Sequence, residues 1–419
     1  MPISAIRWHR RSRMPTAVAL TAALGLALSG CGTAATEAGR DAGPRAGAGA
    51  GGGQDGALRG AVRRLAAQGD APGAAVLIRR TGGGTRFVAS GVADVRTGRR
   101  IHRSDHFRAG SLTKTVVAAM ALRLAAQGRF GLDDTVEEHL PGLVRGHGND
   151  GRNITIRQLL NQTSGLFDYT EDPVLARQLS AAADRIRTPA SLVRTALTHR
   201  PYFAPGAEWH YSNTNYVLLG MVVQRATGRS YADQARREVL GPLRLHATSF
   251  PGTRTTLPAP HGRAYTRESG PRDSGTRDSG TRDSGARGDG ARRDVTDLNP
   301  SYAGAAGELV STLDDLSHLL SGLLRGTVVP RAELRQMRNT AASAGQYGMG
   351  LFPVRLSCGV TLWGHNGEIT GSYALAVATP DGRHTLAYRL NSTADPGLAA
   401  ETSLLETEFC PRRQDTDRG

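Results

Sequence analysis

Apolar residues form strand-like runs at both ends of the chain and helix-like runs between them. The first two strand-like runs lie at 74–80 and 86–92, and Gly83 and Gly84 between them favour a hairpin. Three more lie near the end, at 360–363, 372–378 and 384–390. Helix-forming runs occupy 57–68, 115–127, 216–227, 313–324 and 396–408. We therefore predict an α+β fold, with one antiparallel sheet assembled from both ends, flanking helices and an inserted all-helical lobe.

The first 31 residues have the pattern of an export signal. Four arginines precede an apolar run from 16 to 28, which is too short for a stable membrane-spanning helix. The run ends in Leu-Ser-Gly-Cys at 28–31, which resembles the lipobox of bacterial lipoproteins. We expect lipidation of Cys31 and a membrane anchor facing the cell wall, and a plain signal peptide is the alternative. Residues 32–56 are rich in Gly and Ala without periodicity, so we predict a disordered linker there.

The remaining residues are predicted to form one domain at 57–410, followed by a tail at 411–419. Within it, 266–294 carries a five-residue Arg-Asp-Ser-Gly repeat, which we predict to be a disordered insertion. The formal charge of +15 comes without a dense basic patch interleaved with aromatic residues, so we expect no nucleic-acid partner.

The candidate chemistry begins at the only lysine of the chain, Lys114, because every other basic side chain is Arg. Arg keeps its proton, whereas a desolvated Lys can lose it and act as a base. Ser111 lies three residues earlier, so on a helix the two side chains share one face, with Cβ atoms about 5–6 Å apart. The helix-forming run that follows places Ser111 in a first helical turn, where free N–H groups favour a developing anion. The pair predicts an activated nucleophile, although a capping Ser beside a surface Lys would have the same spacing.

Cys358 and Cys410 are the only cysteines after Cys31. In an exported protein, two remaining thiols most simply form a disulfide. Two cysteines with scattered histidines give no metal-ligand spacing, so we expect neither a metal nor another cofactor.

Three motifs in order give the chain a family resemblance. They are Ser111-Leu112-Thr113-Lys114, Tyr211-Ser212-Asn213 and His365-Asn366-Gly367. They resemble S-x-x-K, Y-x-N and H/K-x-G of the serine beta-lactamase and penicillin-binding superfamily, in the branch of class C beta-lactamases and D-alanyl-D-alanine carboxypeptidases. Gln162 stands where a His is more usual, and Cys358 and Cys410 lie where the carboxypeptidases carry a disulfide.

The resemblance implies a role for each matching residue. Ser111 is expected to attack a carbonyl while Lys114 and Tyr211 exchange its proton, with the ammonium lowering the pKa of the Tyr211 phenol. Asn213 would hold the substrate amide and orient Lys114. The N–H groups of Ser111 and Glu368 would form an oxyanion hole.

The residues around the third motif bear on the substrate. His365 is the carboxypeptidase-like choice, but Asn366 and Glu368 replace hydroxyl residues on the strand face that would meet a terminal carboxylate. Glu368 would repel that group unless an arginine such as Arg355 neutralises it.

We therefore expect an acyl-enzyme serine hydrolase, foremost a D-alanyl-D-alanine carboxypeptidase acting on peptidoglycan stem peptides. An esterase or beta-lactamase on the same scaffold is the nearest alternative. A lipoprotein that binds penicillin or peptidoglycan without turnover is an alternative of another class, which the intact Ser111, Lys114 and Tyr211 disfavour.

Overall fold

The computed structural model describes residues 50–181, 184–267 and 292–410. The predicted signal peptide with Cys31, the linker up to residue 49, the centre of the repeat insertion and the tail at 411–419 lie outside these residues.

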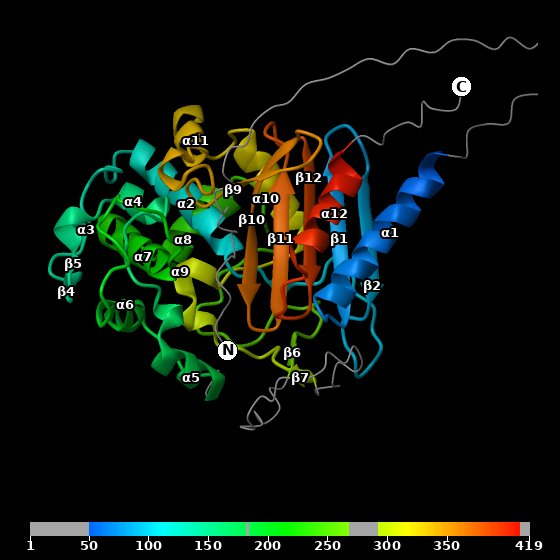
Figure 1. Ribbon diagram of the computed structural model, residues 1–419, viewed down its shortest axis with the longest axis horizontal. Helices are drawn as coiled ribbons and strands as arrows, with labels where there is room; N and C mark the ends of the chain where they lie inside the picture. Colours follow the sequence, from blue (N-terminus) through cyan, green and yellow to red (C-terminus); the bar gives the residue numbers. More distant parts are fainter. Residues whose placement is uncertain (1–49, 182–183, 268–291, 411–419) are drawn as a thin grey trace, which may run out of the picture.

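A six-stranded antiparallel sheet forms the centre of the molecule, in the order β2-β1-β12-β11-β10-β9 (Figure 1). Its strands are β1 (Gly73–Arg80), β2 (Thr85–Gly91), β9 (Phe352–Arg355), β10 (Thr361–Ile369), β11 (Ser372–Ala378) and β12 (His384–Leu390). Strand β1 pairs with β12 from Ala74 opposite Leu390 to Arg80 opposite His384. The two ends of the chain therefore build one sheet, and the predicted α+β class is confirmed.

Helices cover both faces of the sheet. The side chains of each strand alternate between the two faces, so each face carries apolar side chains that a helix layer buries. Helices α1 (Ala50–Gln68) and α12 (Leu398–Phe409) pack on the face that carries Val76, Ile78 and Tyr388. Helices α2 (Leu112–Ala126) and α10 (Leu313–Leu324) pack on the opposite face, against small residues such as Ala376 and Ala387.

A mostly helical lobe lies beside the sheet, on the left of Figure 1. Its helices include α3 (Val136–His139), α4 (Ile156–Leu160), α5 (Pro173–Ala181), α6 (Pro189–Leu197), α7 (Asn213–Thr227), α8 (Tyr231–Ala235), α9 (Gly304–Gly307) and α11 (Arg331–Met337). Single helical turns are η1 (Gly151–Asn153), η2 (Tyr169–Glu171), η3 (Arg236–Leu240), η4 (Pro300–Tyr302) and η5 (Ala341–Ser343). Short strand pairs are β3 (Phe107–Arg108) with β8 (Val310–Ser311), β4 (Arg145–Gly146) with β5 (Asn149–Asp150), and β6 (Tyr265–Arg267) with β7 (Arg292–Asp294).

Two predicted boundaries differ from the structure. Helix α1 begins at Ala50, inside the predicted linker 32–56, because it continues the turns that bury Leu58 and Val62 against the sheet. Likewise, Thr266 and Arg267 pair with Arg293 and Arg292, so the two ends of the segment 266–294 are strands of a small ladder. The amino-acid composition did not predict this pairing, because both ends of the segment are Arg-rich like the repeat between them.

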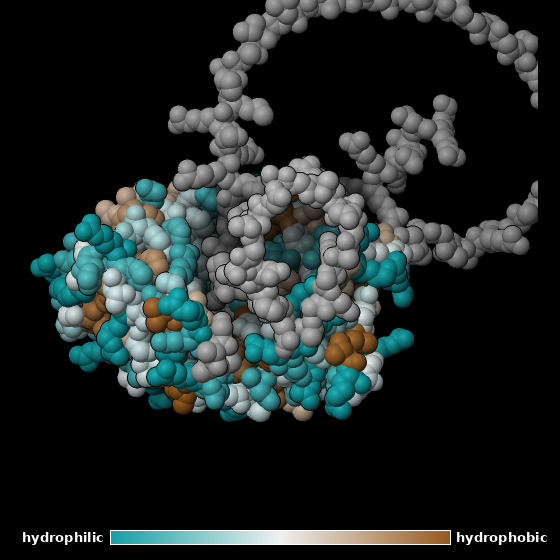
Figure 2. Space-filling model, turned by 60° about the horizontal axis from the view of Figure 1, so that its bottom comes forward, coloured by the Kyte–Doolittle hydropathy of each residue, from teal (hydrophilic) through white to brown (hydrophobic). Residues whose placement is uncertain are grey.

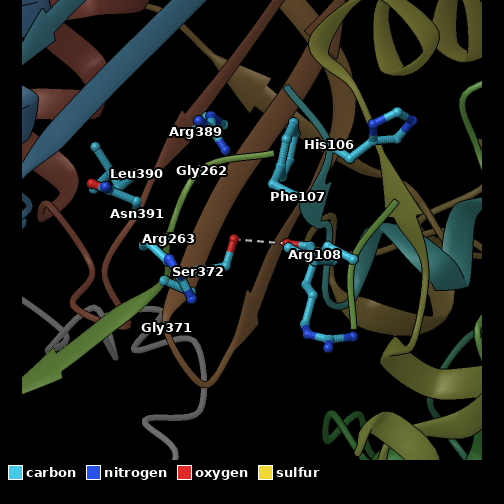
Figure 3. A pocket seen from close by; sticks show the side chains of 12 residues that line it. His106, Phe107, Arg108, Gly262, Arg263, Gly371, Ser372, Arg389, Leu390 and Asn391 are labelled. Carbon is cyan, nitrogen blue, oxygen red and sulfur yellow. Dashed lines mark hydrogen bonds between the residues drawn. The ribbon is translucent and has the colours of Figure 1, made fainter. Parts of the chain in front are cut away.

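Helix α2 passes between the sheet and the helical lobe, and most of its residues are buried. It therefore has no polar face, as its nearly continuous apolar sequence predicts. The segment leading into it is anchored on both sides: Ser372 Oγ of β11 donates a 2.7 Å hydrogen bond to the Arg108 carbonyl (Figure 3), and Arg108 Nη2 donates to the Leu298 carbonyl at 2.8 Å. The start of α2 is thus fixed relative to the sheet.

Cys358 and Cys410 form the expected disulfide, with their Cα atoms 5.9 Å apart. It ties the turn between β9 and β10 to the end of α12. In Figure 2, apolar residues on the visible face lie in separate small groups within a largely hydrophilic surface. Within the described ranges, none of the helices combines the length and the apolar character needed to cross a bilayer.

Candidate active site

Ser111 and Lys114 lie one turn apart at the start of α2. Ser111 occupies the N-cap position, and Lys114 Nζ lies 3.2 Å from Ser111 Oγ. Gly110 precedes them with φ +54°, a left-handed conformation that glycine adopts without steric cost. The predicted spacing on one helical face therefore brings hydroxyl and amine within hydrogen-bond distance.

Lys114 is fully buried, and its amine makes two shorter contacts. Nζ lies 2.7 Å from Asn213 Oδ1 and 2.7 Å from the Ala306 carbonyl oxygen. Burial lowers the pKa of Lys114 to about 7, although the carboxylate of Asp168 acts to raise it. Near neutral pH a large fraction of Lys114 is therefore an uncharged amine, as a base requires.

Tyr211 brings its phenol to the same amine from the segment before α7. Lys114 Nζ lies 4.7 Å from the centre of the Tyr211 ring. Burial raises the pKa of Tyr211 well above its ordinary value, and a hydrogen bond with Ser111 opposes the change only in part. The expectation that a neighbouring ammonium lowers this pKa is wrong, because the loss of solvation of the phenol outweighs the influence that lowers it. Tyr211 is therefore a proton donor at neutral pH.

Strand β10 carries the third motif directly past the nucleophile. A Cβ added to Gly367 would lie 1.9 Å from the Ala109 carbonyl oxygen and 2.9 Å from Ser111 N. A Cβ on Gly110 would lie 2.7 Å from both the amide nitrogen and the carbonyl oxygen of Glu368. Both glycines are thus required for the close approach of β10 to the start of α2.

The direction of the Glu368 N–H follows from the strand register. Trp363 of β10 pairs with Pro353 of β9, which has no N–H, so this is a non-hydrogen-bonded pair. The neighbouring Gly364 therefore directs its N–H toward the β9 side, and by the period of two so does Glu368. Strand β9 ends opposite Gly364, and beyond it this edge faces Gly110 and Ser111. This register is consistent with the predicted oxyanion hole of the Ser111 and Glu368 N–H groups, which stays a prediction.

His365 is buried and uncharged. Its Nδ1 faces the Asn366 carbonyl oxygen, which can only accept, so Nδ1 carries the proton and Nε2 accepts from Tyr347 Oη at 3.0 Å. Burial lowers the pKa of His365 to about 3. His365 therefore supplies no positive charge to a substrate, and it packs edge-on against Tyr347, with ring centres 5.7 Å apart.

Asn366 and Glu368 share the other face of β10. Asn366 Nδ2 donates to Tyr373 Oη at 3.2 Å, and Tyr373 lies directly opposite Glu368. Burial, together with the carboxylate of Asp395, raises the pKa of Glu368 to about 7. Arg355 of β9 pairs with Thr361 of β10. Thr361 lies seven residues before Glu368 on the same strand, so the backbones of Arg355 and Glu368 are about 23 Å apart. The proposed neutralisation of Glu368 by Arg355 is therefore wrong.

Sequence reasoning missed Asp168, which lies behind Asn213. Its Oδ2 accepts from Asn213 Nδ2 at 2.9 Å, and its side chain is almost completely buried. Its signal in the sequence is a single carboxylate within an otherwise apolar and aromatic stretch, 166–169. Across the described ranges, no group of three or more His, Cys, Asp or Glu residues has a metal-binding arrangement.

Comparisons with known proteins agree with this geometry. In the curated set, Protein flp from Staphylococcus aureus (strain N315) is 33% identical over 187 residues, 44% of this chain and 36% of that protein. The match thus spans about a third of this relative's length.

Solved structures match over nearly their whole length. A D-stereospecific amidohydrolase from Streptomyces sp. has a TM-score of 0.74 and 40% identity, covering 85% of this chain and 98% of that one. A D-amino acid amidase from Ochrobactrum anthropi SV3, solved with L-phenylalanine amide, has a TM-score of 0.70 and 25% identity over the same shares. The family model described as Beta-lactamase matches residues 58–408. The chain therefore belongs to the beta-lactamase family of serine hydrolases.

Proposed function

We propose that this serine hydrolase cleaves amides of D-amino acids that carry a free α-amino group, through an acyl-enzyme on Ser111. Two of the similar solved structures are a D-stereospecific amidohydrolase and a D-amino acid amidase, and the first is 40% identical over 85% of this chain. The arrangement of Ser111, Lys114 and Tyr211 supports the acyl-transfer chemistry, and the substrate preference rests on Glu368.

The Glu368 carboxyl group is the single observation that carries the substrate class. A substrate carbonyl held between the N–H groups of Ser111 and Glu368 has its neighbouring groups close to this residue. The influences on its pKa are burial and the carboxylate of Asp395, and no cation is among them. With His365 uncharged and Arg355 distant, an ammonium group would find a partner here. A terminal carboxylate would be repelled.

The proposed reaction assigns each proton to a named atom. Ser111 Oγ attacks the amide carbonyl and passes its proton to the neutral amine of Lys114. The oxyanion accepts hydrogen bonds from the two backbone N–H groups. As the C–N bond breaks, Tyr211 gives its phenolic proton to the leaving nitrogen and regains one from Lys114. Water then hydrolyses the ester with the same groups acting in reverse.

The predicted D-alanyl-D-alanine carboxypeptidase activity stays a prediction with less support. Its substrate ends in a carboxylate, which Glu368 disfavours at neutral pH. The peptidoglycan substrate and the lipid anchor at Cys31 likewise stay predictions. An esterase activity is compatible with the same acyl-enzyme and needs no charged group on the substrate.

The test compares D-phenylalanine p-nitroanilide with its N-acetyl derivative and with the L-enantiomer, at pH 8. We expect the free D-amine to have the highest kcat/KM, by at least about tenfold over the N-acetyl form, since a charge-assisted hydrogen bond contributes about 1.5–3 kcal/mol. Glu368→Gln should lose this preference while still cleaving the N-acetyl substrate, and Ser111→Ala gives the background. Equal or better cleavage of the N-acetyl form, or of a diacyl-Lys-D-Ala-D-Ala peptide, would overturn the assignment.

A further inference from the structure

The buried carboxylate of Asp168 forms hydrogen bonds with both of its oxygens. Oδ1 accepts from Thr170 N at 3.0 Å and from Thr170 Oγ1 at 2.9 Å, while Oδ2 accepts from Asn213 Nδ2 at 2.9 Å. Burial raises the pKa of Asp168, whereas the hydrogen bonds from Thr170 and Asn213 and the charge of Lys114 act to lower it. In each of these contacts the carboxylate is the acceptor, so the ionised form is the one that fits them. The amide of Asn213 therefore lies between the carboxylate of Asp168 and the amine of Lys114 and forms a hydrogen bond with each.

The contacts of Lys114 determine which neighbours take its two N–H groups and which neighbour faces its lone pair. The Ala306 carbonyl and Asn213 Oδ1 can only accept, and each lies 2.7 Å from Nζ. A neutral amine has two N–H groups, and these two acceptors use both. Its lone pair is then left for the third neighbour, the Ser111 hydroxyl at 3.2 Å.

This allocation depends on the orientation of the Asn213 amide. If the amide were turned over, Nδ2 would face Lys114 and donate to the lone pair that Ser111 needs. Asp168 prevents the turn because a carboxylate can accept from Nδ2 but has nothing to donate to Oδ1.

We propose that Asp168 is a positioning residue that fixes the Asn213 amide and thereby directs the lone pair of Lys114 at Ser111. The proposal rests on Lys114 acting as the base of the proposed function, but it does not depend on the substrate class.

The other titratable groups around Lys114 are uncharged, so Asp168 is the charged group that shifts the pKa of Lys114. Tyr211 and Tyr216 present their rings to Nζ at 4.7 and 5.5 Å, and burial keeps both phenols protonated. Tyr169, beside Asp168, has a pKa raised well above its ordinary value, and its hydroxyl donates to the Tyr302 carbonyl. His365 of β10 is uncharged, as shown above.

The single lysine of the chain permits a direct test that needs no substrate. Protein labelled with [ε-13C]lysine has one lysine resonance, from Lys114, and its shift with pH reports the pKa. We expect a midpoint near 7 in the wild type. In Asp168→Asn the midpoint should fall, because the raising charge is gone. Glu171→Gln is the matched control: it removes a carboxylate three residues along, whose partner is Tyr202, and should leave the midpoint unchanged.

Exchanging the two side chains separates orientation from charge. In the double variant Asp168→Asn with Asn213→Asp, the new amide at 168 donates to one oxygen of the new carboxylate at 213, and the other oxygen faces Lys114. We expect Asp168→Asn alone to reduce the acylation rate about 10²-fold, as misplacement of a catalytic group does. The exchange should recover much of that loss while moving the lysine midpoint above the wild-type value.

The acylation rate is measured with p-nitrophenyl acetate, whose reaction does not depend on Glu368, so failure of the D-amide assignment does not affect this test. A folded Asp168→Asn protein with an unmoved lysine midpoint and a rate within threefold of wild type would overturn the proposal. So would an exchange variant that folds but recovers none of the rate. If Asp168→Asn does not fold, the exchange variant alone decides: an acylation rate near that of the wild type supports the proposal, and a folded exchange variant without acylation overturns it.

Discussion

The amine of Lys114 lies 3.2 Å from the hydroxyl of Ser111, and its two shorter contacts are both to carbonyl-type oxygens. A buried lysine with this set of neighbours can be a base only when it is neutral. The pKa of Lys114 therefore controls the reaction, and several consequences can be measured.

The first prediction is a rise of kcat/KM with pH through about 7. Lys114 must be deprotonated to accept the Ser111 proton, and burial lowers its pKa to about 7, so activity is low at pH 5 and reaches a plateau above about pH 8. An uncharged substrate such as p-nitrophenyl acetate isolates this limb from the ionisation of Glu368. Lys114→Arg, which stays protonated, should be slower by about 10³-fold at every pH. A wild-type profile that is flat from pH 5 to 9 would contradict the role of Lys114.

The second prediction concerns the glycine of the third motif. Gly367→Ala would place a methyl group 1.9 Å from the Ala109 carbonyl oxygen, so β10 and the start of α2 must separate. We expect a loss of about 1–3 kcal/mol in the free energy of unfolding and a loss of acylation of at least about 10²-fold. Gly84→Ala is the control, because a Cβ at Gly84 would meet open space. Denaturant unfolding and acylation rates check both effects, and normal acylation by Gly367→Ala would show that the approach of β10 is not needed.

The third prediction is that the carboxylate of Glu368 lowers the free energy of unfolding at high pH. The pKa of Glu368 is raised from 4.5 to about 7 by burial and Asp395, so the native state holds a proton that the unfolded state releases between these values. Stability from this group is present below pH 4.5 and is lost as pH rises to about 7. Glu368→Gln should therefore be more stable than wild type at pH 8, by about 2 kcal/mol after allowance for partial exposure, and similar at pH 4. Unfolding curves at the two pH values check this, and an equal difference at both would contradict it.

The fourth prediction separates the disulfide from catalysis. Cys358 and Cys410 close a 52-residue loop, whose restriction in the unfolded chain contributes about 4 kcal/mol. The double replacement by Ser should lower the melting temperature. It should leave kcat/KM nearly unchanged at 25 °C, because the bridge joins the β9–β10 turn to the end of α12, away from Ser111. Loss of activity in a variant that is still folded at the assay temperature would show a link to the site.

The fold and the three motifs could be predicted because their signals are local. Strand runs and turn residues gave the sheet, and the i, i+3 spacing of Ser111 and Lys114 gave their contact. Asp168 was not found, because its role depends on a contact with Asn213, 45 residues later in the chain. The pKa direction of Tyr211 was predicted wrongly because desolvation, which sequence does not report, outweighs a nearby amine. The position of Arg355 depended on strand register, which only the pairing of β9 with β10 fixes.

The central claim is that Ser111 forms an acyl-enzyme with a D-aminoacyl group. Its most direct test is a rapid-quench time course with D-phenylalanine p-nitroanilide, followed by intact-mass measurement and peptide mapping. We predict a transient mass increase of one phenylalanyl residue, located on the peptide that contains Ser111, absent from Ser111→Ala and much weaker with the N-acetyl substrate. Release of p-nitroaniline over many turnovers with unmodified Ser111 in every quenched sample, and at an equal rate in Ser111→Ala, would contradict the claim.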